Sequence, residues 1–339
     1  MSKLNYISVA GYGSTGSSAV VNLLEEVENC SVIGGEFRFI QDPDGLEDLC
    51  FNLTHSWGWV RSDAFVRRFI RYTDILGRDP NYFQFGERLD ILFNNKFIKY
   101  RNEFIDSIVD TKWKGYWFYH DYHERNAIQT FIEKIKRYTR RFGVDKKTIR
   151  KITKKTDMYF VRSDKDIYKY AKLFINNLFD EYISNHKNTN IVLDQLILPY
   201  NRGKFELLFD GLKQIVVDRD PRDVYLDAMT YNAYPITDDI NTFISFYETS
   251  RNVESINGDG SKILFVKFED LVLNYDNEVK RIFDFLDIDS SSHVRIKSRF
   301  NPDISIKNTQ TWKRSEFDKY RIEIDAIEEK LKKYCYDFK

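Results

Sequence analysis

The chain has 339 residues, 42% of them hydrophobic, which is enough for one large α/β domain or two small ones. Its 52 basic and 52 acidic residues balance to a formal net charge of zero, which argues against a general nucleic-acid binder. The sequence shows no charged-then-apolar leader and no apolar run near the roughly 20 residues of a membrane span. Its three cysteines are far apart, so we expect reduced thiols in a cytoplasmic protein.

Five short β-rich runs alternate with helical patterns along the chain. Several of these runs are apolar on successive residues, as expected of strands covered on both faces. The alternation predicts an α/β fold with a doubly wound parallel sheet of about five strands, in a single domain over residues 1–339. The runs are Tyr6–Ala10, Ser31–Ile33, Asn190–Asp194, Gln214–Asp218 and Lys262–Lys267.

The segment between the second and third runs, residues 46–188, is too long for a simple crossover. It reads as mostly helical and is rich in aromatic residues, so we expect a helical insertion that covers the ligand crevice as a lid. Within it, residues 133–157 form a basic run. This run fits a pair of solvated helices, or a patch that attracts an acidic glycan or an anionic membrane.

A glycine-rich loop, VAGYGSTGSSAV, joins the first run to a helical pattern. Gly11, Gly13 and Gly16 spell the dinucleotide fingerprint G-x-G-x-x-G, which is a weak signal alone. Gly11 and Gly16 also have the spacing of the phosphate loop G-x-x-x-x-G-K-[ST], but Ser17 replaces its lysine. Backbone N–H groups at a positive helix end would form an anion cradle in either case. A tight turn with serine capping is the structural alternative.

A second motif begins where the fourth run ends, at Arg219 in the sequence RDPRDV. An arginine fork at the carboxyl end of a buried strand suits a phosphate group. The alternative is an ion pair of Arg219 with Asp220 or Asp223.

The combined pattern resembles the PAPS-dependent sulfotransferase family, in a divergent bacterial-type form (PAPS is 3′-phosphoadenosine 5′-phosphosulfate). The family's loop S-G-T-T, its motif R-[DN]-P-[RK]-D-V, its E-D-L segment and its closing basic loop with tryptophan have counterparts in the same order. The resemblance covers residues 5–37 and 191–312 and implies a P-loop-kinase-like fold. The counterparts are residues 14–18, 219–224, 265–289 and 307–313.

The resemblance implies in-line transfer of the sulfuryl group of PAPS to an acceptor hydroxyl, with PAP (3′,5′-bisphosphoadenosine) as the product and no metal required. Arg219, with Lys307 as a second candidate, would hold the 3′-phosphate. The 5′-phosphosulfate would lie on the first loop, whose candidate ligands are Ser14, Thr15, Gly16, Ser17 and Ser18.

The general base is also suggested by the resemblance. Many relatives use a histidine in a T-H-L-P-like stretch, but here Ile197 takes that place. Carbohydrate-acting and bacterial relatives use a glutamate shortly after the second strand, and Glu36 fits that arrangement. A carboxylate needs burial to raise its pKa for such work. The alternative for Glu36 is a structural bond with Arg38.

Two positions depart from the family pattern. Ser14 replaces the loop's usual basic residue, and Asp227 replaces a serine that binds the 3′-phosphate. An aspartate repels a phosphate unless it is turned away or paired. The cations that could replace the missing charge are Arg38, Lys114 and Arg222.

The acceptor we expect is a carbohydrate, because a glutamate base and a basic insertion suit a glycan. A sterol or another lipid alcohol is the alternative, because the aromatic-rich insertion could line an apolar pocket. Two other interpretations remain: a kinase-like or nucleotide-sugar-dependent transferase, and a non-catalytic nucleotide-binding protein. The oligomeric state is not predicted.

Overall fold

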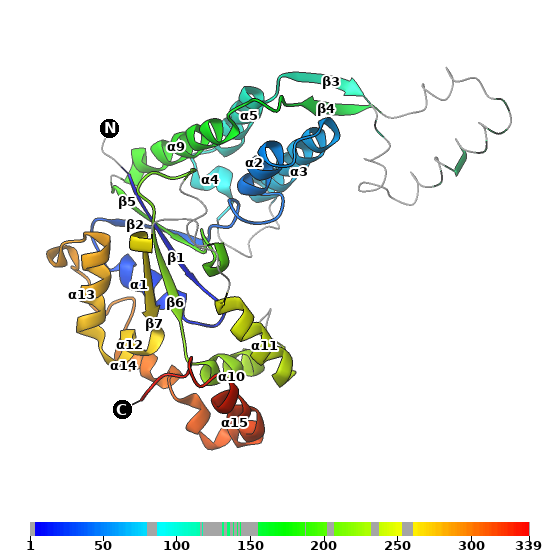
Figure 1. Cartoon of the computed structure of the whole chain (residues 1–339). Coiled ribbons are helices and arrows are strands. Elements are labelled where there is room, and N and C mark those ends of the chain that lie inside the picture. The colour runs from blue at the N-terminus through cyan, green and yellow to red at the C-terminus, as the bar shows by residue number, and fades with distance from the viewer. Residues whose placement is uncertain are drawn as a thin grey trace.

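The computed structural model describes residues 4–79, 87–115, 155–186, 188–201, 207–231, 237–252 and 260–338, with isolated positions between 116 and 154. Its centre is a sheet of five parallel strands in the order β2-β5-β1-β6-β7 (Figure 1). This confirms the predicted parallel sheet, and every predicted run lies on one of its strands except for Lys262, which ends η2. The strands are β1 (Asn5–Gly11), β2 (Cys30–Glu36), β5 (Asn190–Asp194), β6 (Lys213–Asp218) and β7 (Ile263–Lys267).

Helices cover both faces of the sheet. Alternate side chains of each strand point to opposite faces, so each strand contributes to two cores. Tyr6 and Ile191 join one core with helices of the 46–186 region, and Ile7 and Val192 join a second core with α1, α12 and α13. The helices of the first core are α2 (Leu46–Thr54), α3 (Trp59–Arg78), α4 (Leu89–Leu92), α5 (Phe97–Ile108) and α9 (Ile167–His186). Those of the second are α1 (Ser17–Glu25), α12 (Phe268–Leu273) and α13 (Tyr275–Leu286).

The region between β2 and β5 is mainly helical where it is described, as expected, and its aromatic rings pack together: Phe104 and Phe174 stack with centroids 5.3 Å apart. The sequence did not predict its antiparallel hairpin, β3 (Thr111–Gly115) with β4 (Thr156–Phe160). Most of the basic run 133–157 lies outside the described residues. The boundaries 46–188 and the role as a lid remain predictions.

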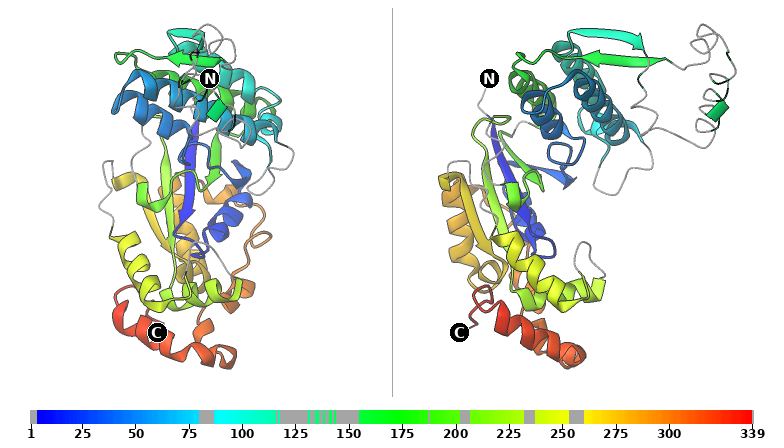
Figure 2. Two further views of the ribbon diagram at one scale, coloured as in Figure 1. Left: turned by 90° about the vertical axis from the view of Figure 1, so that its right-hand side faces the viewer. Right: turned by 45° about the vertical axis from the view of Figure 1, so that its right-hand side comes forward.

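The C-terminal third adds a third core below the sheet in Figures 1 and 2. Tyr225 and Phe243 pack there with Ile327. Across the described residues, no helix combines the length and apolar character needed to cross a membrane. The remaining helices are α10 (Pro221–Tyr231), α11 (Ile240–Arg251), α14 (Pro302–Ser305) and α15 (Arg321–Lys330), and the short 3₁₀ helices are η1 (Pro199–Asn201), η2 (Gly260–Lys262), η3 (Ser290–Ser292), η4 (Ile306–Asn308), η5 (Thr311–Lys313) and η6 (Ser315–Tyr320).

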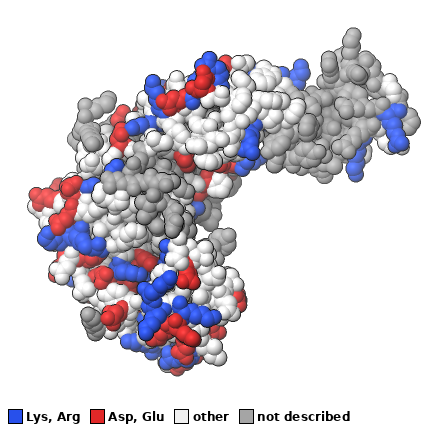
Figure 3. Space-filling model, viewed as in Figure 1, with Lys and Arg blue, Asp and Glu red and all other residues white. Residues whose placement is uncertain are grey.

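The charged surface matches the balanced composition. Figure 3 shows lysine and arginine side chains interspersed with aspartate and glutamate over the face in view. Around the sheet and the C-terminal helices, a mixed surface of this kind gives no single-sign field.

Candidate functional site

The loop between β1 and α1 has the backbone of an anion cradle. Gly13, Ser14 and Gly16 have φ angles of 92°, 52° and 83°, in the left-handed region. A Cβ on Gly16 would lie 2.6 Å from the ring of Phe268, so this position has no room for a side chain. Gly16 also precedes the first turn of α1 and gives no side-chain cap to its N–H groups. The N–H of Ala19 donates to the carbonyl of Gly16 at 3.0 Å, which leaves the amides of Ser17 and Ser18 to serve an anion at the positive end of the helix.

The polar side chains of the loop have different roles. The hydroxyl of Thr15 is buried, donates to the carbonyl of Val217 in β6 at 2.8 Å, and accepts from the backbone N–H of Tyr12 at 3.1 Å. Thr15 therefore fixes the loop to the sheet, and only its backbone is placed to serve a ligand. Ser17 accepts a hydrogen bond from Gln195 at 3.2 Å, on the side of β5.

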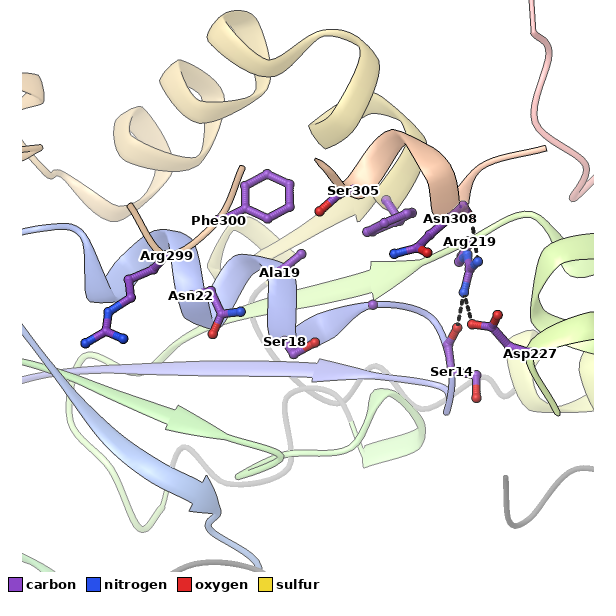
Figure 4. A pocket seen from close by; sticks show the side chains of 12 residues that line it. Ser14, Ser18, Ala19, Asn22, Arg219, Asp227, Arg299, Phe300, Ser305 and Asn308 are labelled. Atoms are coloured by element: carbon purple, nitrogen blue, oxygen red, sulfur yellow. Dashed lines mark hydrogen bonds and ion pairs between the residues drawn. The ribbon is translucent and has the colours of Figure 1, made fainter. Parts of the chain in front are cut away.

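Ser14 and Ser18 instead face a cavity of about 320 Å³ between α1 and the segment that leads into α14 (Figure 4). This volume lies at the lower end of the range of ligand-binding pockets. The other lining residues are Gly16, Ala19, Asn22, Arg219, Asp227, Phe268, Arg299, Phe300, Ser305 and Asn308.

Arg219 lies at the end of this cavity nearest Ser14, as Figure 4 shows. It is only 3% exposed, and its guanidinium lies over the ring of Phe268, 5.2 Å from the centroid. One terminal nitrogen donates to the carbonyl of Ser14 at 3.1 Å and to the carboxylate of Asp227. The other donates to the carbonyl of Asn308 at 2.6 Å. The ion pair that the sequence left open is thus made with Asp227, and with neither Asp220 nor Asp223.

The other charged residues of the RDPRDV motif do not line the cavity but hold the closing loop, residues 307–313. Asp220 pairs with Arg222 at 2.7 Å, and the guanidinium of Arg222 lies 4.0 Å above the ring of Trp312. Asp223 is fully buried and accepts from the backbone N–H groups of Gln310 and Thr311 at 2.9 and 2.8 Å. The RDPRDV motif and the closing loop, which are far apart in sequence, are therefore in contact, and the first turn of α10 fixes the position of that loop.

The other predicted cations lie elsewhere. Lys307 is exposed and does not line the cavity. The three cations that could replace the charge missing at Ser14 are each paired with a carboxylate: Arg38 with Asp42, Lys114 with Asp157, and Arg222 with Asp220. In the described part of the chain, Arg219 is the predicted cation that reaches the cavity.

Glu36 lies on the other side of the loop, at the carboxyl end of β2. Its side chain is 36% exposed, and Arg38 approaches it at 3.4 Å. Its neighbour on β5 is Asp194, whose side chain the sequence did not single out. Burial, with the negative charge of Glu36, raises the pKa of Asp194 to about 7, and its Oδ1 is buried with no hydrogen-bond partner among the described residues. Two carboxyl groups thus meet at this sheet edge, beside Gln195 and the loop.

The raised pKa of Asp194 beside Glu36 leads us to expect that the stability of the fold depends on pH. Because the folded chain holds the Asp194 proton up to about pH 7 and the unfolded chain releases it near pH 4, Asp194 lowers the free energy of unfolding as the pH rises between these values. Asp194→Asn should therefore raise Tm relative to the wild type by several degrees more at pH 8 than at pH 4.5, measured by thermal melts. The exposed control Asp325→Asn should show no such pH-dependent gap. An equal gap for both variants would contradict the buried proton.

A comparison with known protein families finds a match for the C-terminal part of the chain. Residues 196–334 match the model of the sulfotransferase domain. This segment contains Arg219, the carboxylates Asp220 and Asp223, and the closing loop around Trp312. The resemblance to sulfotransferases is confirmed there. A search of curated proteins found no match to the chain.

Several solved structures are similar to the chain at low identity. The sulfotransferase domain of the Synechococcus PCC 7002 olefin synthase is 12% identical, with 100% of this chain and 98% of that chain covered and a TM-score of 0.44. Sulfotransferase STF9 from Mycobacterium avium is 11% identical, with 98% and 76% covered and a TM-score of 0.36. A retinol dehydratase in complex with androsterone and the inactive cofactor PAP is 14% identical, with 97% and 80% covered and a TM-score of 0.33.

Proposed function

We propose that this chain, whose residues 196–334 match the sulfotransferase domain, transfers the sulfuryl group of PAPS to a hydroxyl of an acceptor. The observation that carries the proposal is the open amide cradle of residues 14–18, which borders a cavity walled by the family-matched segment. The residues fit the 5′-phosphosulfate end of the donor. At the other end, the arginine proposed for the 3′-phosphate already pairs with Asp227.

The proposed reaction is an in-line displacement at sulfur. The acceptor oxygen bonds to sulfur while the bond from sulfur to the bridging phosphate oxygen breaks, so PAP leaves and the acceptor proton passes to a base. The cradle amides would stabilise charge on the oxygens, as donors aimed at developing charge do. Ser14 carries no positive charge, so in this chain the backbone dipoles of the loop would stabilise the charge on these oxygens.

Glu36 is the proposed base. It ends β2 next to Asp194, and the following residue, Gln195, donates to Ser17 of the cradle at 3.2 Å. Asp194 and Gln195 thus connect Glu36 to Ser17 of the cradle. A base must come within hydrogen-bond reach of the proton it takes, and this edge of the sheet is where an acceptor hydroxyl would have to lie.

We propose a carbohydrate acceptor, with a sterol or other lipid alcohol as the alternative. A screen with labelled PAPS against hydroxylated glycans and lipid alcohols tests this. Transfer to sterols but to no sugar would overturn the carbohydrate proposal. A location in the cytoplasm and contact of the basic run 133–157 with glycans or anionic membranes remain predictions.

The nucleotide class is tested by thermal melts with PAP, ATP–Mg, NAD and a nucleotide sugar in parallel. A ligand at 100 times its Kd stabilises a protein by about 2.7 kcal/mol, which a melt resolves. We expect stabilisation by PAP, and none by NAD or the nucleotide sugar. Stabilisation by ATP–Mg or NAD without any by PAP would favour a kinase-like or dinucleotide-binding protein. Binding of PAP without transfer to any acceptor would favour a non-catalytic one.

Arg219→Ala should lower PAP affinity by about tenfold or more, because it removes the buried guanidinium that joins Ser14 to Asn308 across the cavity. Isothermal titration measures the change. The exposed Arg321→Ala is the matched control and should bind as the wild type does. Unchanged affinity in Arg219→Ala would remove this arginine from the nucleotide site.

A further inference from the structure

The end of the cavity formed by Arg219 and Asp227 carries a matched pair of charges. Asp227 comes from the middle of α10, lines the cavity, and is 30% exposed. Its carboxylate accepts from the guanidinium of Arg219, which is nearly buried. Figure 4 shows the two side chains meeting beside Ser14. The formal charge of this end of the cavity is therefore zero.

No other cation offsets Asp227 at this end, within the lining that the structure describes. The second arginine of the lining, Arg299, lies at the opposite end of the cavity in Figure 4 and approaches Glu25 at 3.5 Å. Lys307 is exposed and outside the lining. A phosphate placed against Arg219 would therefore lie beside a carboxylate, and like charges at such a distance repel strongly in a partly desolvated site.

A sugar hydroxyl meets the same pair favourably. A carboxylate is an acceptor, so it can take a hydrogen bond from a ribose hydroxyl without losing its arginine. A neutral group also brings no charge that needs balancing.

We infer that the Arg219–Asp227 pair receives the ribose hydroxyls of the nucleotide, so that the chain binds an adenosine 5′-nucleotide with a free 3′-hydroxyl at least as tightly as its 3′-phosphorylated form. The inference rests on the proposed function and narrows its donor. An adenosine 5′-phosphosulfate with an unmodified ribose is bound as well as PAPS or better. The discriminating residue is Asp227.

Isothermal titration with 5′-AMP and with PAP tests this, because the two probes differ only in the 3′-phosphate. In the wild type we expect a Kd for 5′-AMP equal to or below that for PAP. Asp227→Asn keeps the shape and removes the charge, so PAP should bind about tenfold more tightly than before, while 5′-AMP changes little. Asp284→Asn is the matched control, because it removes a carboxylate from an exposed ion pair with Lys280 on α13.

The outcomes are distinct. Wild-type binding of PAP tenfold tighter than 5′-AMP overturns the inference and leaves the proposed function standing. Unimproved PAP binding in a folded Asp227→Asn also overturns it. If the variant does not fold, the wild-type comparison of the two probes decides alone. Failure of the wild type to bind either probe overturns the proposed function together with the inference.

Discussion

Replacement of Glu36 by glutamine should lower the rate of sulfuryl transfer by about 10²–10⁴-fold, the usual contribution of a general base. Glutamine keeps the shape of the side chain at the end of β2, but it cannot take the proton of the acceptor hydroxyl. Nucleotide affinity should stay near the wild-type value, because Glu36 lies on the β5 side of the loop, away from the cavity lining. Single-turnover rates with labelled PAPS, together with titration of PAP, measure the two effects separately.

A matched control is Glu103→Gln on α5, where the exposed glutamate makes an i,i+4 contact of 3.8 Å with Lys99. It should retain full turnover. Full turnover in Glu36→Gln would show that Glu36 is not the base. Loss of turnover in Asp194→Asn with none in Glu36→Gln would assign the proton transfer to Asp194 instead.

The parallel sheet was predictable because its signals are local. The runs around Ile191 and Val216 are apolar on successive residues, and burial on both faces produces that pattern whatever surrounds them. The cradle was predictable for a similar reason, since Gly16 occupies a position that no side chain can fill. Local backbone geometry restricts which residue types can adopt it, so it can be predicted from the sequence.

The pairing of charges was not predictable from the same patterns. Arg219 lies at a strand end and Asp227 eight residues later on a helix, whereas Asp218, Asp220 and Asp223 are nearer in sequence. Which of them meets the guanidinium depends on how α10 is set against the sheet and the closing loop. The hairpin of β3 and β4 was missed because its strands lie 41 positions apart, from Gly115 to Thr156, with no turn signal to join them.

The residues of the RDPRDV motif have different structural roles. In RDPRDV, only Arg219 reaches the cavity, whereas Asp220 and Asp223 hold the closing loop through Arg222 and two backbone amides. Matching the motif therefore indicates how the closing loop is held more directly than which ligand the site binds. The ligand is set by what stands opposite Arg219, and here that residue is Asp227.

The buried carboxylate of Glu26 supports the part of the cavity lining formed by Arg299 and Phe300. Glu26 follows α1, is completely buried, and accepts from the backbone N–H groups of Lys297, Arg299 and Phe300 at 3.0, 2.7 and 2.8 Å. The ring of His293 lies 2.7 Å from the same carboxylate. Since Arg299 and Phe300 line the cavity, this one side chain joins the end of the cradle helix to the wall facing it.

Glu26→Gln should therefore lower the free energy of unfolding by about 3 kcal/mol or more, because hydrogen bonds to a buried charge are strong and an amide NH₂ would face backbone N–H groups. PAP affinity should fall with it as the wall loosens. Urea unfolding followed by fluorescence measures the first effect and titration the second. The adjacent Glu25→Gln, on a half-exposed side chain, should change stability by less than about 1 kcal/mol. Equal urea midpoints for the two variants would show that the wall is held by other contacts.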